Sequence, residues 1–333
     1  MTGALRRDHP LWRAAYRPLF LCAGLWALLT PVVWLWPGGL GADPVRWHLH
    51  EMMFGMGGAA VGGDLLTALP SGAGRGPVSA QMVRSLTVLW LVARLALPVG
   101  GQLPFVLLLA VALGYFGLLA AVLARHLLLA RVWSGFWSVA LVVAMALGNA
   151  ALLADRLGRA DAGTAPMAMV TLFATLIGTL GGRMVPAFAR RWMLNVGDRR
   201  HLPDNGALAG LAAVATGLAG GLILSGLDRV AGMGLLVAGA LQAVRLAGWL
   251  RARPWHYPAL LMLYLAWVWV PVGLALLGVA LLRPDILLPG AALHALTMGA
   301  MGTTILAIAA RPAMARVGAS GARCSTASRR RAA

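Results

Sequence analysis

Long apolar runs separated by short polar segments dominate the chain. A run of about 20 apolar residues is the length that an α-helix needs to cross the hydrocarbon core of a bilayer. Counting such runs predicts roughly ten transmembrane helices. Their expected limits are Pro18–Trp36, Val45–Leu69, Ala80–Leu97, Leu103–Ala124, Trp133–Leu153, Gly163–Phe188, Asn205–Ser225, Arg229–Leu250, Tyr257–Leu281 and Ile286–Ala310.

The composition is also that of a membrane protein. Of the 333 residues, 60% are hydrophobic and 11% are charged, whereas a soluble domain of this size needs a far more polar surface. We therefore predict an all-α fold, a polytopic transmembrane helix bundle that forms a single domain over residues 1–312. Residues 313–333 are expected to form a polar, basic, disordered tail. The first apolar run is too long for the core of a cleaved signal peptide, so we expect it to remain as a signal anchor.

The basic residues predict how the chain is oriented in the membrane. All 28 of them are arginine, and the net charge is +18. They lie singly or in small groups within loops, which does not indicate a nucleic-acid partner. Arginine-rich loops stay on the cytoplasmic side, so both termini are predicted to be cytoplasmic. The alternate loops that carry arginines contain Arg75, Arg84, Arg125, Arg131, Arg190, Arg191, Arg199, Arg200, Arg251 and Arg253.

The segment Trp47–Gly55 places two imidazoles and a carboxylate at the mouth of the second span. Hydrocarbon tolerates ionisable groups poorly, so His48, His50 and Glu51 are expected to face a protein interior and to mark function. Histidine is also the commonest metal ligand, because its neutral ring nitrogen binds a metal without adding charge. The alternative is a pair of interfacial histidines with a glutamate that favours the helix dipole.

Helical spacing limits what these residues can do together. His48 and Glu51 are three residues apart and share a helix face. His48 and His50 point about 200° apart, so they cannot ligate one metal from a regular helix. Either the helix is irregular there or the two histidines have different partners.

A second histidine lies in the tenth span. His294 forms a stripe with Met298 and Met301, and thioether and imidazole groups together suit copper. The alternative for these methionines is ordinary gap-filling in the core. His50 and His294 are each followed five residues later by a glycine, in a glycine-rich stretch. Such stretches allow close helix packing or let a flat macrocycle lie against the helix.

The predicted topology brings several polar residues to the same depth. His294 lies about 12 Å below the outer surface, by the rise of an α-helix. The other members are near the outer ends of their spans, so we predict that the second and tenth spans share a site there. The residues at this depth are His48, His50, Glu51, Arg94, Asn149 and His294.

Five segments resemble the NnrS family, polytopic membrane proteins that contain haem and copper and are associated with nitric oxide. The two histidine segments are the most specific of the five. The chain departs from the family pattern where further histidines are replaced by Gln242, Tyr264, Leu153 and Arg316, and by having about two spans fewer. These departures weaken the prediction of copper more than that of haem, and indicate a shortened, divergent or incomplete member. The matching segments are Tyr16–Phe20, His48–Met52, Leu65–Pro70, Gly181–Pro186 and His294–Thr303.

The resemblance implies a haem-binding, multi-pass protein of the bacterial inner membrane that helps the cell withstand nitric oxide. Its implied ligands are His48, His50 and His294, for haem and for copper as a second metal. Glu51 is expected to orient a ring nitrogen. Arg94 is expected to pair with a haem propionate or with Glu51, the alternative being an arginine that reaches the outer headgroups. The expected partners are the lipid bilayer, haem, and nitric oxide or an iron–nitrosyl species.

A different class of function is a secondary transporter of a small solute or metal. Helices interrupted by glycine, with polar residues inside the membrane, are typical of such proteins. A transporter usually has carboxylates deep in the membrane or an inverted repeat, and only Glu51 and Asp64 are candidates here. A purely structural membrane subunit would leave the histidines unexplained. The sequence does not assign a reaction.

Cysteine labelling tests the predicted orientation. A cysteine introduced between Gly38 and Pro44 should react with an impermeant thiol reagent added from the periplasmic side. A cysteine at Ser320 should react only after the membrane is permeabilised, because both termini are predicted to be cytoplasmic. The opposite pattern would overturn the topology and the depth argument built on it.

Overall fold

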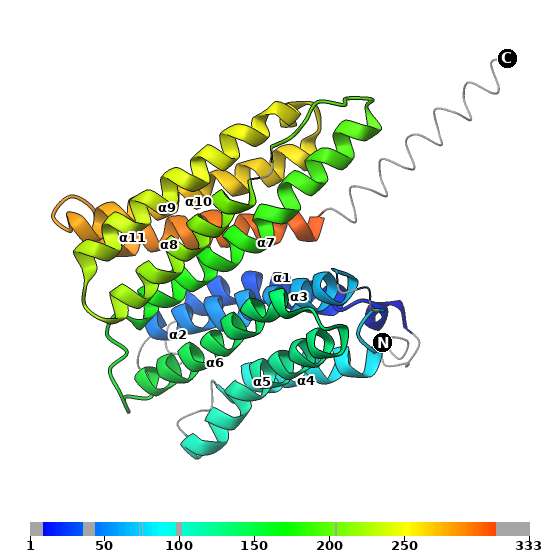
Figure 1. The fold of residues 1–333 in the computed structure, drawn as a ribbon. Coiled ribbons are helices and arrows are strands. Elements are labelled where there is room, and N and C mark those ends of the chain that lie inside the picture. The colour runs from blue at the N-terminus through cyan, green and yellow to red at the C-terminus, as the bar shows by residue number, and fades with distance from the viewer. Residues whose placement is uncertain are drawn as a thin grey trace. The chain divides into compact units, whose positions relative to one another are not determined.

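The computed structural model describes residues 9–35, 44–72, 74, 76–97, 102–203 and 205–310. Regular structure within these ranges is helical throughout, which confirms the all-α prediction (Figure 1). Nine helices of the described part are long and apolar enough to cross a membrane. The third expected span is α4 (Ala80–Ala96), which forms with 17 residues and is shorter than those nine. Arg75, Arg316 and the expected tail at 313–333 lie outside the described residues.

The chain divides into two compact units, Met1–Met169 and Val170–Ala333. The boundary falls inside α7 (Ala165–Asn195), and each unit is described by itself. Whether the two units behave as the single predicted domain stays a prediction.

Unit 1 contains the first five expected spans. The second of these is built from three consecutive pieces, a short α-helix, a π-helix and a longer α-helix. Residues Tyr16–Phe20 pack against this span at Gly63, where an added Cβ would lie 3.3 Å from Cβ of Leu19. The helices are α1 (Tyr16–Trp34), α2 (Pro44–His50), η2 (Glu51–Gly57), α3 (Gly58–Gly72), α4, α5 (Phe105–Ala130) and α6 (Phe136–Arg156).

Unit 2 contains the remaining spans. Its last span repeats the composite construction, because a short α-helix is followed by a π-helix. α9 and α10 approach closely where Gly232 faces Gly278. An added Cβ on either glycine would lie 2.9 or 2.8 Å from the carbonyl oxygen of the other, so only small residues fit. The helices are α7, α8 (Gly206–Leu224), α9 (Asp228–Trp249), α10 (Pro258–Leu282), α11 (Pro289–His294) and η7 (Ala295–Gly302), and this last span continues to Ala310.

Both π-helices begin directly after a histidine, η2 after His50 and η7 after His294. π-Helical turns are rare, and they occur frequently at functional sites. Side chains donate to the carbonyl oxygens in and next to η2. The indole Nε1 of Trp90 donates to Gly55 O at 2.9 Å, and the hydroxyl of Tyr115 donates to Gly58 O at 3.0 Å.

The glycines of the second span receive side chains from neighbouring helices. An added Cβ would lie 2.9 Å from the Phe116 ring at Gly58, and 2.0 Å from the Tyr115 hydroxyl at Gly62. In unit 2, a Cβ on Gly299 would lie 2.6 Å from the Trp269 ring. Aromatic side chains therefore pack against these three glycines, whereas Gly63 lets α3 approach the backbone of α1 at Tyr16. The macrocycle alternative stays a prediction.

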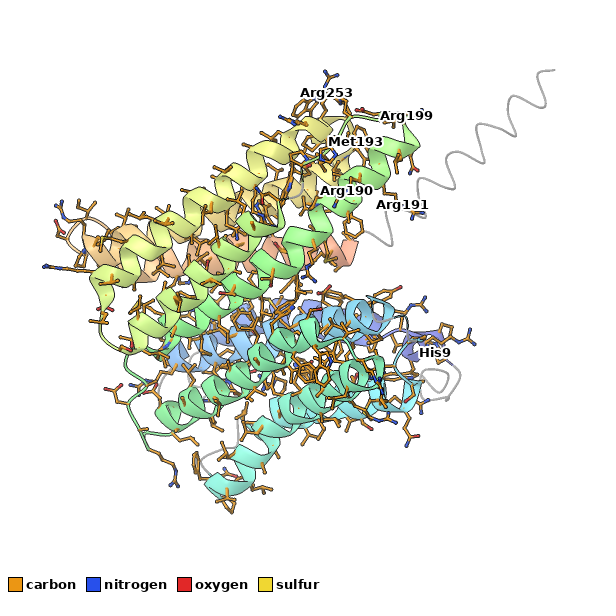
Figure 2. All side chains as sticks on the ribbon, in the orientation of Figure 1. His9, Arg190, Arg191, Met193, Arg199 and Arg253 are labelled. Carbon is orange, nitrogen blue, oxygen red and sulfur yellow. The ribbon has the colours of Figure 1, made fainter. Side chains whose placement is uncertain are left out.

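Arginines gather at one end of unit 2. Figure 2 shows Arg190 and Arg191 there in the last turns of α7, with Arg199 and Arg253 in loops; the sequence predicts all four to be cytoplasmic. At another loop, Arg283 pairs with Asp285 at 2.8 Å, and this hydrogen bond lowers the pKa of the Asp285 carboxyl below its usual value. The orientation of these ends relative to the membrane stays a prediction.

Replacing Gly278 by alanine tests the contact between α9 and α10. The new Cβ would lie 2.8 Å from a backbone oxygen, which cannot move aside as a flexible side chain can. We expect a loss of about 1–3 kcal/mol, the usual effect of overpacking, measured as thermal unfolding of the detergent-purified protein. Gly217→Ala on α8 is the matched control, because nothing lies within 4 Å of its Cβ. Equal stability of the two variants would contradict the contact.

Candidate functional site

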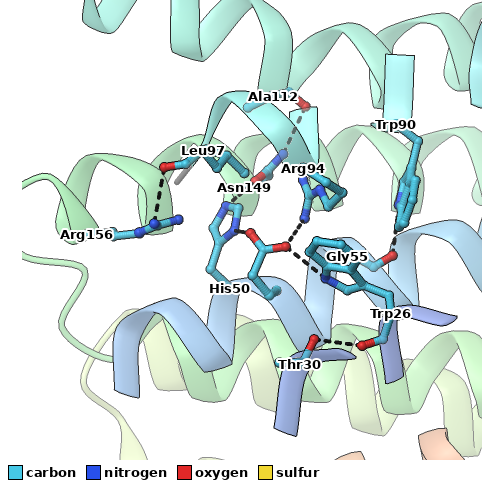
Figure 3. A network of polar contacts seen from close by, with 11 residues as sticks. Trp26, Thr30, His50, Gly55, Trp90, Arg94, Leu97, Ala112, Asn149 and Arg156 are labelled. Atoms are coloured by element: carbon cyan, nitrogen blue, oxygen red, sulfur yellow. Dashed lines mark hydrogen bonds and ion pairs between the residues drawn. The ribbon is translucent and has the colours of Figure 1, made fainter. Parts of the chain in front are cut away.

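A buried polar network in unit 1 centres on the carboxylate of Glu51, which Trp26, His50 and Arg94 contact. Figure 3 shows these three residues side by side. Oε2 of Glu51 accepts two hydrogen bonds, from Nε1 of Trp26 at 2.9 Å and from the guanidinium of Arg94 at 2.9 Å. Its Oε1 lies 3.2 Å from Nδ1 of His50. Glu51 is 1% exposed and Arg94 is 3% exposed, so the ion pair between them is shielded from solvent. Arg94 therefore pairs with Glu51, one of its two expected partners.

His50 is held at both ring nitrogens. Its Nε2 lies 2.7 Å from Oδ1 of Asn149, and its ring is fully buried. Nδ2 of Asn149 donates to the carbonyl oxygen of Ala112 at 3.0 Å, which sets the orientation of the amide. Oδ1 of Asn149 consequently accepts, so Nε2 of His50 carries a proton.

Nδ1 of His50 and Oε1 of Glu51 are 3.2 Å apart, within reach of a hydrogen bond. The ring directs this nitrogen at the Glu51 carboxylate, and Nε2 keeps its proton because it faces an acceptor.

Gly55 makes room for the donors of this network. An added Cβ at Gly55 would lie 2.4 Å from Nε1 of Trp26 and 3.1 Å from the guanidinium of Arg94. A side chain here would push both groups away from Glu51. The rings of Trp26 and Trp90 pack edge to face, with centroids 5.6 Å apart, and so support the first donor.

His48 lies apart from the network. α2 is a regular helix through His50, so the two imidazoles point in different directions as their spacing predicts. The half-buried ring of His48 packs edge to face against Trp34 of α1, with centroids 4.8 Å apart. The two histidines therefore have different partners, Trp34 for His48 and Asn149 on α6 for His50.

A cavity of about 230 Å³ lies beside the start of α2 in unit 1. Arg46 and Leu49 of α2 and Leu152 and Asp155 of α6 line part of it. Arg46 forms an ion pair with Asp155 at 3.0 Å. The residues that line the cavity on α2 and α6 thus lie within about two helical turns of His50 and Asn149.

His294 belongs to unit 2 and has a different environment. Its ring is exposed, and Nδ1 lies 2.8 Å from the carbonyl oxygen of Gly290. Because a carbonyl only accepts, Nδ1 carries the proton and Nε2 keeps its lone pair in the neutral ring. The two methionines expected to form a stripe with His294 differ in burial, since Met298 is 69% exposed and Met301 is 3% exposed.

Unit 2 contains a buried polar cluster of its own, which was not predicted from the sequence. The guanidinium of Arg245 on α9 donates to Oε1 of Gln242 at 2.7 Å and to the carbonyl oxygens of Gly178 and Gly182 on α7, each at 3.2 Å. It also lies 5.4 Å from the centroid of the Trp267 ring. A Cβ at Gly182 would lie 2.4 Å from Arg245, which explains the glycine in this segment. The available signal was an arginine that still lies within the apolar run, about one turn before its end.

The structure thus brings together some of the predicted residues. His50, Glu51, Arg94 and Asn149 form one network, joined by Trp26, which the sequence did not single out. The predicted approach of His294 to His50 stays a prediction. Within the ranges that the structure describes, no three His, Cys, Asp or Glu side chains gather in a way that could hold a metal ion.

Fold and network together define an all-α, polytopic membrane protein with a buried ion pair and two histidines that precede π-helices. Comparison with protein families agrees with this class. The family model described as NnrS protein matches residues 10–327, so the chain belongs to the NnrS family. A search of curated proteins and a search of solved structures each found no match.

Replacing Glu51 by glutamine tests the buried ion pair. The change keeps the shape of the side chain and leaves Arg94 without its carboxylate. We expect a loss of about 3–5 kcal/mol, as for other buried pairs that lose one partner, measured by thermal unfolding. Adding Arg94→Met should recover most of this loss, because no buried charge then remains uncompensated. A double variant no more stable than E51Q would contradict this account.

Proposed function

We propose that this protein is a haem-binding NnrS protein of the bacterial inner membrane that helps the cell withstand nitric oxide. Membership of the family supports the class of function. The geometry of His294 is the observation that carries the proposal. Its ring is exposed, its Nδ1 is held by Gly290, and its Nε2 lone pair is directed away from that bond.

This arrangement would suit a histidine that holds haem iron. A ligating histidine commonly donates its other ring nitrogen to a carbonyl or carboxylate, which sets the tautomer and the direction of the lone pair. Met298, about one turn further along, is 69% exposed and offers an apolar surface beside the ring. When bound, haem supplies an iron atom with a coordination position for a small ligand such as nitric oxide.

The histidines of unit 1 differ in how well they fit the same role. Both ring nitrogens of His50 are in hydrogen bonds, so it presents no lone pair to iron in this structure. His48 is the histidine of unit 1 that we assign to ligation, together with His294. Glu51 and Arg94 already bind each other, and we assign them to support of the second span.

Copper remains a separate proposal. His48, His294 and the exposed thioether of Met298 are of the types that bind copper. A thioether and an imidazole separated by about one helical turn, as in His294 and Met298, share a helix face. Metal analysis of the purified protein tests this part independently of haem.

The haem proposal is tested with His294→Ala. We expect the purified wild type to show a Soret band, and the variant to lose most of it, because no apolar neighbour replaces a directional axial bond. Absorption spectra at equal protein concentration measure the effect. His126→Ala is the matched control, since Nδ1 of His126 is likewise 2.8 Å from a carbonyl oxygen one turn earlier, that of Val122. His201→Ala, in a loop, should also leave the band unchanged. A full Soret band in His294→Ala would overturn the assignment.

A further inference from the structure

We propose that His50 is a positioning residue in this chain and does not ligate a metal or haem. Its hydrogen bonds set the rotation of α2 about its axis and thereby direct His48 towards α1. The proposal rests on the proposed function in one respect, that His48 is the histidine of unit 1 assigned to haem.

Both ring nitrogens of His50 are engaged, so neither is free to ligate a metal. Ligation needs an unprotonated ring nitrogen directed at the metal. Nε2 faces Oδ1 of Asn149 at 2.7 Å, and Nδ1 faces Oε1 of Glu51 at 3.2 Å. The ring is fully buried, so no solvent-exposed edge offers another approach.

The partners of His50 are themselves held in place by further hydrogen bonds. Asn149 donates to the carbonyl oxygen of Ala112 on α5 at 3.0 Å, so it cannot turn its amide without losing that bond. Glu51 accepts from Trp26 of α1 and from Arg94 of α4, both at 2.9 Å. Freeing His50 would therefore disturb contacts to α1, α4, α5 and α6 together.

Two contacts to α6 set the rotation of α2 about its axis. His50 and Arg46 are four residues apart and share a helix face. Both bind α6, His50 through Asn149 and Arg46 through Asp155 at 3.0 Å. Two contacts on one face fix the rotation of a short helix. His48 then points about 200° away from His50 and meets Trp34 of α1.

The experiment compares His50→Gln with His50→Ala in detergent-purified protein loaded with hemin. Glutamine can keep hydrogen bonds to Asn149 or Glu51 but does not replace an imidazole ligand. We expect His50→Gln to keep the Soret position and the haem-to-protein ratio of the wild type. His50→Ala should lower the ratio at least twofold, because α2 is then free to turn. The conservative variant thus rescues a positioning role and cannot rescue a ligand.

Thermal unfolding of the apoprotein tests, without haem, whether the contact between His50 and Asn149 holds α2 in place. Asn149→Ala and His50→Gln should each lower the midpoint of thermal unfolding, and the double variant should fall by less than the sum of the two. Additive losses would overturn the coupling of His50 to Asn149. Thr87→Val is the control for a buried polar substitution, since its hydroxyl bonds only within α4, to Val83 O at 2.8 Å.

The outcomes separate this inference from the proposed function. Loss of the Soret band in a folded His50→Gln, equal to the loss in His50→Ala, would show that His50 is a ligand and overturn the inference. If His50→Gln does not fold, Asn149→Ala decides. A lowered haem-to-protein ratio in that variant supports positioning, and an unchanged or raised ratio would overturn it. A full Soret band in His294→Ala would instead count against the proposed function. The unfolding measurements on the apoprotein would still test the coupling of His50 to Asn149.

Discussion

The ion pair between Glu51 and Arg94 is the interaction on which the arrangement of unit 1 depends. A carboxylate inside an apolar helix bundle is costly unless every lone pair finds a donor. Trp26, Arg94 and His50 meet that requirement from three different helices. Because charge-assisted hydrogen bonds are strong where water is absent, this single group gives α1, α2 and α4 one preferred arrangement.

Much of this arrangement could be predicted from the sequence, and the reasons for the remainder are physical. Apolar run length predicted the helix ends to within seven residues, the largest error being the end of α7. Helix depth placed His50, Glu51 and Arg94 at one level. Depth does not give rotation about the helix axis, so the partner of each residue could not be assigned. The hydrogen bond from Trp26 to Glu51 could not be predicted, because the position of an indole in an apolar run does not show which acceptor its N–H reaches. Arg245 is about one turn from the end of α9, where arginines commonly reach the headgroups.

Glycine shows why composition alone does not decide packing in a membrane. In unit 2, Gly232 and Gly278 let two backbones touch, which is the usual use of small residues between transmembrane helices. In unit 1, Gly55 instead admits the donor groups of Trp26 and Arg94, and Gly62 admits a tyrosine hydroxyl. The two uses look identical in the sequence. They differ in consequence, because one sets the distance between helices and the other sets which polar atoms can meet.

The π-helix η2 lets the two halves of one membrane span face different neighbouring helices. A π-helical turn takes up one residue more than an α-helical turn, so the residues beyond it are rotated by about 100° relative to an unbroken helix. The first half can therefore contact α6 through His50, while the second half contacts α5 through the carbonyl oxygen of Gly58. An ordinary α-helix with the same number of residues in place of η2 would turn one half away from its partners. In this span, residue count is thus a structural parameter in its own right, as constrained as the identity of any side chain.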